Sequence, residues 1–168
     1  VEVIAHPDIW AKKYALPADK PARYSGIPFL REDLESRGAR FTLQRGPVRI
    51  SDNVMATGEI PMMTEYEEIE DNLLVKEANS FKPDPLADDC ALVIDADFGL
   101  VGILGCGHRG IVNTLMHARN LTGKDVVYAA IGGTHLVYAS DERIYRTVAD
   151  LKEIGLHRLG TSHCTGFR

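Results

Sequence analysis

The chain is poor in the features that mark several common classes of protein. Its three cysteines are an odd number and include no Cys-x-x-Cys pair, which fits a reducing, cytoplasmic compartment better than a disulfide scaffold. No run approaches the ~20 apolar residues of a membrane helix, and no signal peptide is visible, so we expect no membrane partner. With a net charge of −5, no basic run and no aromatic ladder, the sequence also argues against a nucleic-acid partner.

What is present is the composition of an ordinary globular protein. Hydrophobic residues make up 45% and charged residues 26% of the chain. At 168 residues we expect a single domain over 1–168 with a substantial core. The sequence starts without methionine on an apolar run that is typical of the middle of a strand, which suggests a processed or truncated chain.

The patterning predicts a mixed α/β layered protein, strand-rich at first and alternating later. The Pro-rich stretch that follows the first apolar run, up to residue 30, and the segment 65–71 are predicted as surface loops, and a brief helix over 30–37 is expected to end at Gly38. The remaining expected elements are strands within 39–58, a hairpin over 91–104, a helix from 111 to Gly123, a strand over 125–131 and a helix from 141 to Gly155.

Three apolar runs in the second half each break into a small-residue loop that carries a histidine: His108, His135 and His163. Imidazole is a common metal ligand, and strand ends are places where a sheet can aim it. The spacing is too wide for a zinc finger, so a site would have to be assembled by the fold, as in an open hydrolytic centre. Taken singly, each histidine has the alternative interpretation of ordinary polar surface after a strand.

Two of the cysteines adjoin these histidines. Cys106 lies two residues before the first histidine, and Cys164 directly follows the last. Each thiolate could coordinate zinc or each sulfur could fill a tight turn, and packing is the favoured interpretation for both. Cys90 is predicted to lie in the core.

Other polar residues have simpler interpretations. The pair Asp88-Asp89, at the entry of a predicted strand, could orient a neighbouring loop by hydrogen bonds. We expect His117 and His157 to be structural or exposed, and His6, which precedes a proline, to be exposed.

Several segments together resemble the metallo-β-lactamase-fold hydrolases, and in particular a branch similar to dihydropterin-methyl-ribofuranosylaminobenzene-phosphate synthase. The segments that carry the resemblance are GLVGILGCGHRGIVN (99–113), IGGTHL (131–136), HCTG (163–166), AHPD (5–8), TGEIP (57–61) and DDCALVI (88–94). They cover nearly the whole chain in the order found in that branch.

The resemblance implies an αββα sandwich with one or two metal ions, usually zinc. It implies that His108 and His163 are ligands, and that His135 is either a ligand or a group at the substrate mouth. Cys106 is a fourth candidate ligand. Metal-activated water would then attack an ester, phosphoester or amide of a small-molecule substrate, such as a pterin or a phosphorylated compound.

The sequence departs from the family at one important place. The defining motif His-x-His-x-Asp-His, which supplies most ligands of the first metal, is absent. We therefore expect the chain to be the C-terminal portion of the fold, with an N-terminal segment of the same domain as its partner. The alternative is a non-catalytic binding or interaction module on a degraded fold, and a weaker one is a thiol enzyme that uses Cys106 or Cys164.

Overall fold

The computed structural model describes residues 1–167, which form two compact units. The first unit combines Val1–Arg45 with Ile69–Asp88. The second unit combines Gly46–Glu68 with residues 89–167 and carries the three predicted histidine loops. Along the chain, the sequence therefore passes from the first unit to the second, back to the first, and then again to the second.

The first unit is built from short strands and short helices. Strand β1 (Glu2–Ala5) pairs in parallel with β4 (Arg40–Leu43). Along the chain, the segment that connects these two strands contains the 3-10 helix η1 (Pro7–Trp10) and α1 (Arg31–Ser36). A second, four-stranded sheet has the order β3-β2-β7-β8. Its strands are β2 (Lys13–Ala15), β3 (Arg23–Tyr24), β7 (Leu73–Glu77) and β8 (Ser80–Pro83).

The strand expected at the start of the chain is confirmed by β1, whereas the surface loop expected from there to residue 30 was wrong, and the β7–β8 hairpin was missed. Strands of two or three residues are too short to show an alternating pattern. They form because a distant segment pairs with them: Tyr14 of β2 lies opposite Leu74 of β7. Ion pairs add to this, since the Lys13 ammonium lies 2.9 Å from Asp84 and 2.5 Å from Asp88.

The second unit contains a six-stranded sheet of order β12-β11-β10-β9-β6-β5. Its strands are β5 (Val48–Ser51), β6 (Val54–Ala56), β9 (Ala91–Ala96), β10 (Gly99–Leu104), β11 (Val127–Gly132) and β12 (Arg158–Thr161). The strands from β5 to β10 pair antiparallel, which confirms the predicted hairpin over 91–104. Strands β10, β11 and β12 run parallel.

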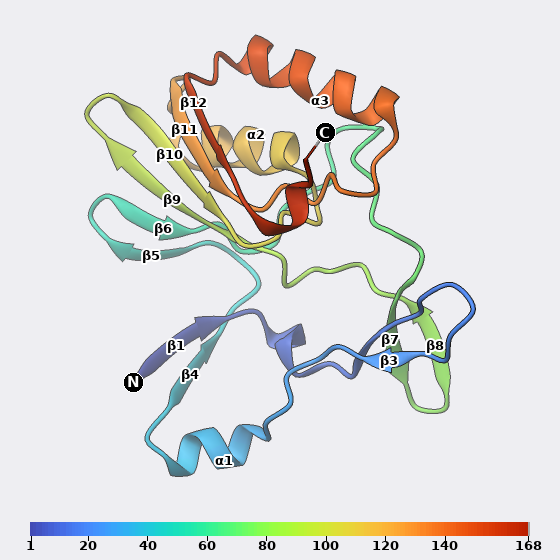
Figure 1. The fold of residues 1–168 in the computed structure, drawn as a ribbon. Helices are drawn as coiled ribbons and strands as arrows, with labels where there is room; N and C mark the ends of the chain where they lie inside the picture. Colours follow the sequence, from blue (N-terminus) through green and yellow to red (C-terminus); the bar gives the residue numbers. More distant parts are fainter. Residues whose placement is uncertain (168) are drawn as a thin grey trace. The chain divides into compact units, whose positions relative to one another are not determined.

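Two helices make the connections between the parallel strands (Figure 1). Helix α2 (Ile111–Thr122) leads from β10 to β11, and α3 (Asp141–Ile154) leads from β11 to β12. Both end at a left-handed glycine, as predicted, at Gly123 and Gly155. Their apolar sides share one buried cluster with the sheet, which includes Leu104, Leu115, Val127 and Leu151. Parallel strands need a long crossover connection, which is usually a helix, and α2 and α3 supply these connections. The predicted mixed α/β class is therefore confirmed.

The other face of this sheet is apolar and only partly covered. Neighbouring residues of a strand point to opposite faces, so Ile103 faces away from the side on which Leu104 packs. In register with it lie Leu92 of β9 and Ile131 of β11. These three side chains remain 37%, 38% and 50% exposed, respectively. A contiguous apolar row of this kind is suited to packing against further protein.

None of the helices within residues 1–167 is long and apolar enough to cross a membrane.

Candidate metal centre

The three histidine loops follow three neighbouring parallel strands. His108 lies in the loop after β10, His135 in the loop after β11, and His163 in the loop after β12. Because the carboxyl ends of parallel strands meet at one edge of the sheet, the fold brings the three loops to the same edge. The predicted placement of these histidines at strand ends is confirmed.

Backbone hydrogen bonds join the loops to one another. The Gly133 amide donates to the Gly105 carbonyl at 3.0 Å, which links the second loop to the first. The Ser162 amide donates to the Gly132 carbonyl at 3.0 Å, which links the third loop to the second. The Thr134 hydroxyl adds a side-chain bond of 3.0 Å to the hydroxyl of Thr165. The three loops therefore form one hydrogen-bonded assembly.

The small residues of the loops are required by this close approach. A Cβ atom on Gly133 would lie 2.5 Å from Sγ of Cys164 and 2.8 Å from the Gly105 carbonyl oxygen. A Cβ atom on Gly107 would lie 2.8 Å from the Gly133 carbonyl oxygen, at a φ of +63°. Only glycine allows the backbones to pass this closely.

His108 and His135 are in direct contact. Their ring centroids are 3.8 Å apart, with an angle of 39° between the ring planes, and both residues are half-buried. His135 has a φ of +47°, so its backbone turns sharply where the ring projects. Two imidazoles brought together at a strand edge are a donor set suited to zinc and to other late first-row metals.

His163 has different neighbours. Its Nε2 lies 3.2 Å from Sγ of Cys106, and its Nδ1 lies 2.9 Å from the Ser162 hydroxyl. Cys164 donates its thiol to the Cys106 carbonyl at 3.3 Å. Burial, and then the neighbouring Cys164 thiol, raise the pKa of Cys106. The four predicted ligands thus fall into two pairs, His108 with His135 and His163 with Cys106, and their binding of metal stays a prediction.

A residue that sequence reasoning missed holds the start of α2. Glu67 is only 1% exposed, and its carboxylate accepts hydrogen bonds from the amides of Val112 at 3.0 Å and Asn113 at 2.7 Å. These amides belong to the first turn of α2, where the helix itself offers no partners. The prediction of a solvated acidic loop over 65–71 was therefore wrong at Glu67.

Burial raises the pKa of Glu67, and the two amide hydrogen bonds oppose that rise. One sequence signal for this contact was available. The residue before Ile111 is Gly110, which has no side chain to cap the helix, so the helix needs a cap from elsewhere. A Cβ atom on Gly110 would lie 2.2 Å from the Glu67 carboxylate.

Asn113 and Asp89 fix the same region. Asn113 is fully buried; its Oδ1 accepts from the amides of Met63 and Thr64, both at 2.8 Å. Its Nδ2 donates to the Arg109 carbonyl at 2.8 Å. The Arg109 amide donates to Asp89 at 2.9 Å, which confirms for Asp89 that the aspartate pair orients a neighbouring loop, whereas Asp88 pairs with Lys13. The loop that carries His108 is therefore held from both sides.

Other residues singled out from the sequence lie away from these contacts. Cys90 is exposed rather than in the core, because it precedes the first residue of β9. His6 is buried rather than exposed, since its Nδ1 accepts from the Asp8 amide and caps η1. His117 lies 3.2 Å from the Thr57 carbonyl, and the exposed His157 stacks on Tyr128.

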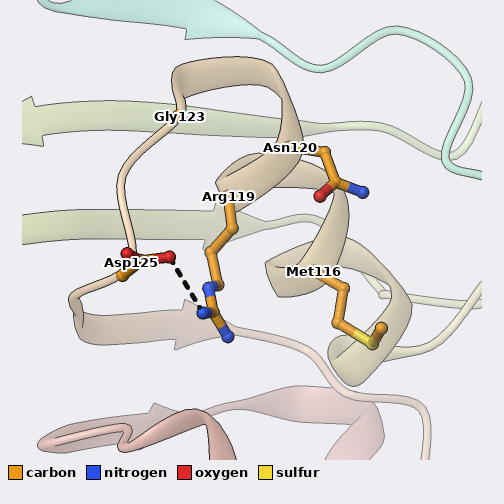
Figure 2. A pocket seen from close by; sticks show the side chains of 5 residues that line it. All are labelled: Met116, Arg119, Asn120, Gly123 and Asp125. Carbon is orange, nitrogen blue, oxygen red and sulfur yellow. Dashed lines mark hydrogen bonds and ion pairs between the residues drawn. The ribbon is translucent and has the colours of Figure 1, made fainter.

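The opposite end of α2 carries an open pocket of about 490 Å³ (Figure 2). Its lining residues are Met116, Arg119, Asn120, Gly123 and Asp125. Arg119 and Asp125 form an ion pair of 3.1 Å at this pocket. A helix of 12 residues is roughly 18 Å long, so this pocket is separate from the loop of His108.

Comparison with known proteins identifies the fold. The solved structure of Tm1679, a metal-dependent hydrolase of the β-lactamase superfamily, matches 98% of this chain with a TM-score of 0.83 and 25% sequence identity. The chain has the metallo-β-lactamase fold. It spans 60% of the Tm1679 chain. No family model matches the sequence.

Two curated relatives of this metallo-β-lactamase-fold chain come from Methanocaldococcus jannaschii. One is named 7,8-dihydropterin-6-methyl-4-(β-D-ribofuranosyl)-aminobenzene-5'-phosphate synthase; it is 33% identical over the whole chain, which spans 58% of the relative. The other is an uncharacterized protein, 30% identical over 99% of the chain, which spans 59% of it. The resemblance drawn from the sequence motifs is confirmed.

Proposed function

We propose that this chain forms part of a metal-dependent hydrolase, with zinc held by His108 and His135. The observation that carries the proposal is the contact between these two rings, which come from the ends of adjacent parallel strands. Imidazole pairs of this kind match the donor chemistry of zinc. The metal-dependent superfamily to which Tm1679 belongs supports the same interpretation.

A metal held there by His108 and His135 would supply an activated water, with a pKa of ~7, and would polarise an ester, phosphoester or amide. The chain's own contribution is positioning. Asn113 and Asp89 hold the loop of His108 by hydrogen bonds to Arg109, Glu67 holds the first turn of α2 that follows it, and the Gly133 amide joins that loop to the loop of His135. Rigid support of this kind keeps ligands in a productive geometry.

For the substrate, we propose a small phosphorylated molecule related to pterins. The support is the name of the 33% identical relative, a dihydropterin-methyl-ribofuranosylaminobenzene-phosphate synthase. Because that relative is named a synthase, a synthetic reaction on a pterin phosphate at the same site is the second candidate. A cytoplasmic location is part of the proposal, on the grounds of the cysteine content.

We further propose that protein outside these 168 residues completes the centre. The chain lacks His-x-His-x-Asp-His and spans about 60% of the proteins it matches. The partly exposed row of Leu92, Ile103 and Ile131 offers an apolar surface on which such a segment would pack.

The experiment combines metal analysis with an assay of chromogenic ester and phosphoester hydrolysis in added zinc. The variants His108→Ala and His135→Ala should each lower the bound metal and the rate. His157→Ala is the matched control, since this histidine is exposed and stacks on Tyr128. Equal metal content and rate in all three variants would contradict the proposal, as would the absence of metal binding in the unaltered protein.

A further inference from the structure

The first unit contains a pocket of about 490 Å³, formed by η1, β3 and the segment that leads into α1. Most of the wall of this first-unit pocket is apolar: Ile9, Trp10, Ile27, Pro28, Phe29 and Leu30. Its volume is within the range of ~300–1,000 Å³ that is usual for sites of small organic molecules. The pocket in Figure 2 has the same volume, but Met116 is the one large apolar residue among its five lining residues. The first-unit pocket is therefore the more apolar of the two.

Several side chains of the first-unit pocket present apolar surface to solvent. Phe29 and Leu30 are 61% and 66% exposed, and Tyr24, which also lines the pocket, is 46% exposed. Exposed apolar groups that gather at one place indicate a binding surface, whereas single ones are ordinary. An aromatic ligand would remove this surface from water, and such burial is a main driving force of association.

Contacts within the first unit hold the walls of the pocket in place. Trp10 packs edge-on against Phe41, with 5.1 Å between the ring centroids. The Tyr24 hydroxyl donates to the Ile27 carbonyl at 2.9 Å, and a Cβ atom on Gly26 would lie 2.7 Å from that hydroxyl oxygen. The ring of Tyr24 is thus folded onto its own turn. A ligand meets walls that are already ordered, which lowers the entropic cost of binding.

The polar groups of the pocket favour a ligand with negative charge. Lys12 and Arg31 line the pocket together with a single acidic residue, Glu32. Arg31 is paired with Glu35 at 2.8 Å, whereas the Lys12 ammonium has no ion-pair partner in the part of the chain that the structure describes. Nε1 of Trp10 is buried without a hydrogen-bond partner among the same residues. A buried donor of this kind is costly, so an acceptor atom that reached it would be bound favourably.

We propose that the first-unit pocket binds a small aromatic anion, with its ring against Trp10 and Phe29 and its charge beside Lys12. A few polar groups in an otherwise apolar wall are the usual means of orienting such a ligand. The lining residues all belong to the first unit, whereas His108 and His135 belong to the second. The site goes beyond the proposed hydrolase function, and its occupation needs no metal.

The first test follows Trp10 by nuclear magnetic resonance. Trp10 is the sole tryptophan of the chain, so a ¹⁵N–¹H spectrum contains a single indole cross-peak, which reports on this pocket. The metal-free protein is titrated with 2-naphthoate, and we expect the indole cross-peak to shift and to reach saturation. A cross-peak that does not move with 2-naphthoate would overturn the site.

Two further probes of the same ring system test the charge of the ligand. They are 2-naphthylmethanol, which is neutral, and 2-naphthylmethylamine, which is a cation at neutral pH. Affinity should fall from the carboxylate to the alcohol to the ammonium, by about 2–5-fold at each step, because an exposed ion pair contributes little. An ammonium that binds as tightly as the carboxylate would overturn the preference for an anion.

Two pairs of variants locate the ligand. Phe29→Ala should weaken binding of 2-naphthoate about 5–50-fold, because the ligand loses an apolar wall. Phe81→Ala is its matched control, since Phe81 is 46% exposed in β8 of the same unit and is not part of the pocket. Lys12→Gln should weaken binding about 2–5-fold, and Lys20→Gln, at an exposed lysine outside the pocket, should leave it unchanged. Equal effects within either pair would contradict the placement.

His108→Ala distinguishes this site from the hydrolase proposal. Binding of 2-naphthoate should persist in that variant, whereas hydrolysis should fall, and loss of binding would overturn a site that needs no metal. The titration is then repeated on a longer protein that includes the segment proposed to complete the metal centre. If the Trp10 cross-peak no longer responds there, protein covers the pocket and the ligand site is refuted.

Discussion

The two ends of α2 differ in how their polar groups are satisfied. At the amino end, the first-turn amides bond to Glu67, which is almost fully buried, and Asn113 is buried beside it. At the carboxyl end, Arg119 pairs with Asp125, whose side chain is 91% exposed, at the rim of an open pocket (Figure 2). Both ends of the helix carry a glycine with positive φ.

The difference shows that the buried polar contacts of α2 are concentrated at its amino end. Buried hydrogen bonds to a charged group are strong and costly to break, whereas exposed ion pairs contribute little. The strong contacts lie beside the loop of His108, which carries a proposed metal ligand. Substitutions at the two ends should therefore have very different effects on stability.

The largest difference is expected between Gly110→Ala and Gly123→Ala. Both glycines have positive φ, but a Cβ atom on Gly110 would lie 2.2 Å from the Glu67 carboxylate, whereas one on Gly123 would have nothing within 4 Å. We expect Gly110→Ala to lower the free energy of unfolding by about 3–5 kcal/mol and Gly123→Ala by about 1–2 kcal/mol. Chemical denaturation measures both, and equal losses would show that the clash is relieved without cost.

Removal of the buried cap should follow in size. Glu67→Ala leaves the Val112 and Asn113 amides without their carboxylate partner, which we expect to cost about 2–4 kcal/mol. The same change should weaken metal binding at His108, because the loop that carries it loses its support. Denaturation curves and metal titration test the two effects, and a loss below 1 kcal/mol would mean that water replaces the carboxylate.

The protonation of Glu67 offers a smaller, pH-dependent effect. Since burial raises its pKa in the folded protein, the unfolded chain releases this proton first as pH rises above about 4.3. Stability from the protonated group is complete below that pH and is lost as pH rises toward the raised pKa. Relative to Glu67→Gln, the unaltered protein should lose up to about 1.4 kcal/mol per pH unit within this window.

The measurement is the difference in unfolding free energy between the unaltered protein and Glu67→Gln at a series of pH values. If the unaltered protein instead became more stable relative to Glu67→Gln as pH rises, the prediction would be wrong. The two amide hydrogen bonds would then be keeping Glu67 in its carboxylate form.

The smallest effect is expected at the carboxyl end. Asp125→Ala removes the exposed ion pair with Arg119 and should change the unfolding free energy by less than about 1 kcal/mol. High salt should reduce even this difference, because exposed charges are screened. A salt-independent loss above 2 kcal/mol would place Asp125 on a level with Glu67 and remove the contrast between the two ends.

Local patterns in the sequence were sufficient for much of the second unit. The left-handed glycines at 123 and 155 and the apolar spacing of α2 and α3 are encoded within single elements. The three histidine loops could be placed because each directly follows its strand. Gly110 indicated that α2 needs a cap from elsewhere, but Glu67 could not be named as that cap, since its partners lie 45 and 46 residues away and no local pattern links them.

The grouping of the predicted ligands into two pairs also could not be inferred from the sequence. Cys106 and His108 are two residues apart, yet they face different partners, His163 and His135. Gly107, with a φ of +63°, redirects the chain between them, and the resulting directions depend on the neighbouring loops. In the first unit, pairing between β2 and β7 likewise depended on distant residues.

Five non-glycine residues in the described part of the chain have positive φ, and two of them are His135 at +47° and His163 at +23°. Most L-residues avoid this region at a cost of roughly 1–2 kcal/mol, whereas glycine enters it freely. Evolution of the gene under selection for heat resistance alone should therefore drive His135→Gly and His163→Gly to high frequency. Under selection for function, both histidines should be retained. A difference between the two selections at these positions would show that the protein keeps His135 and His163 although they lower its stability.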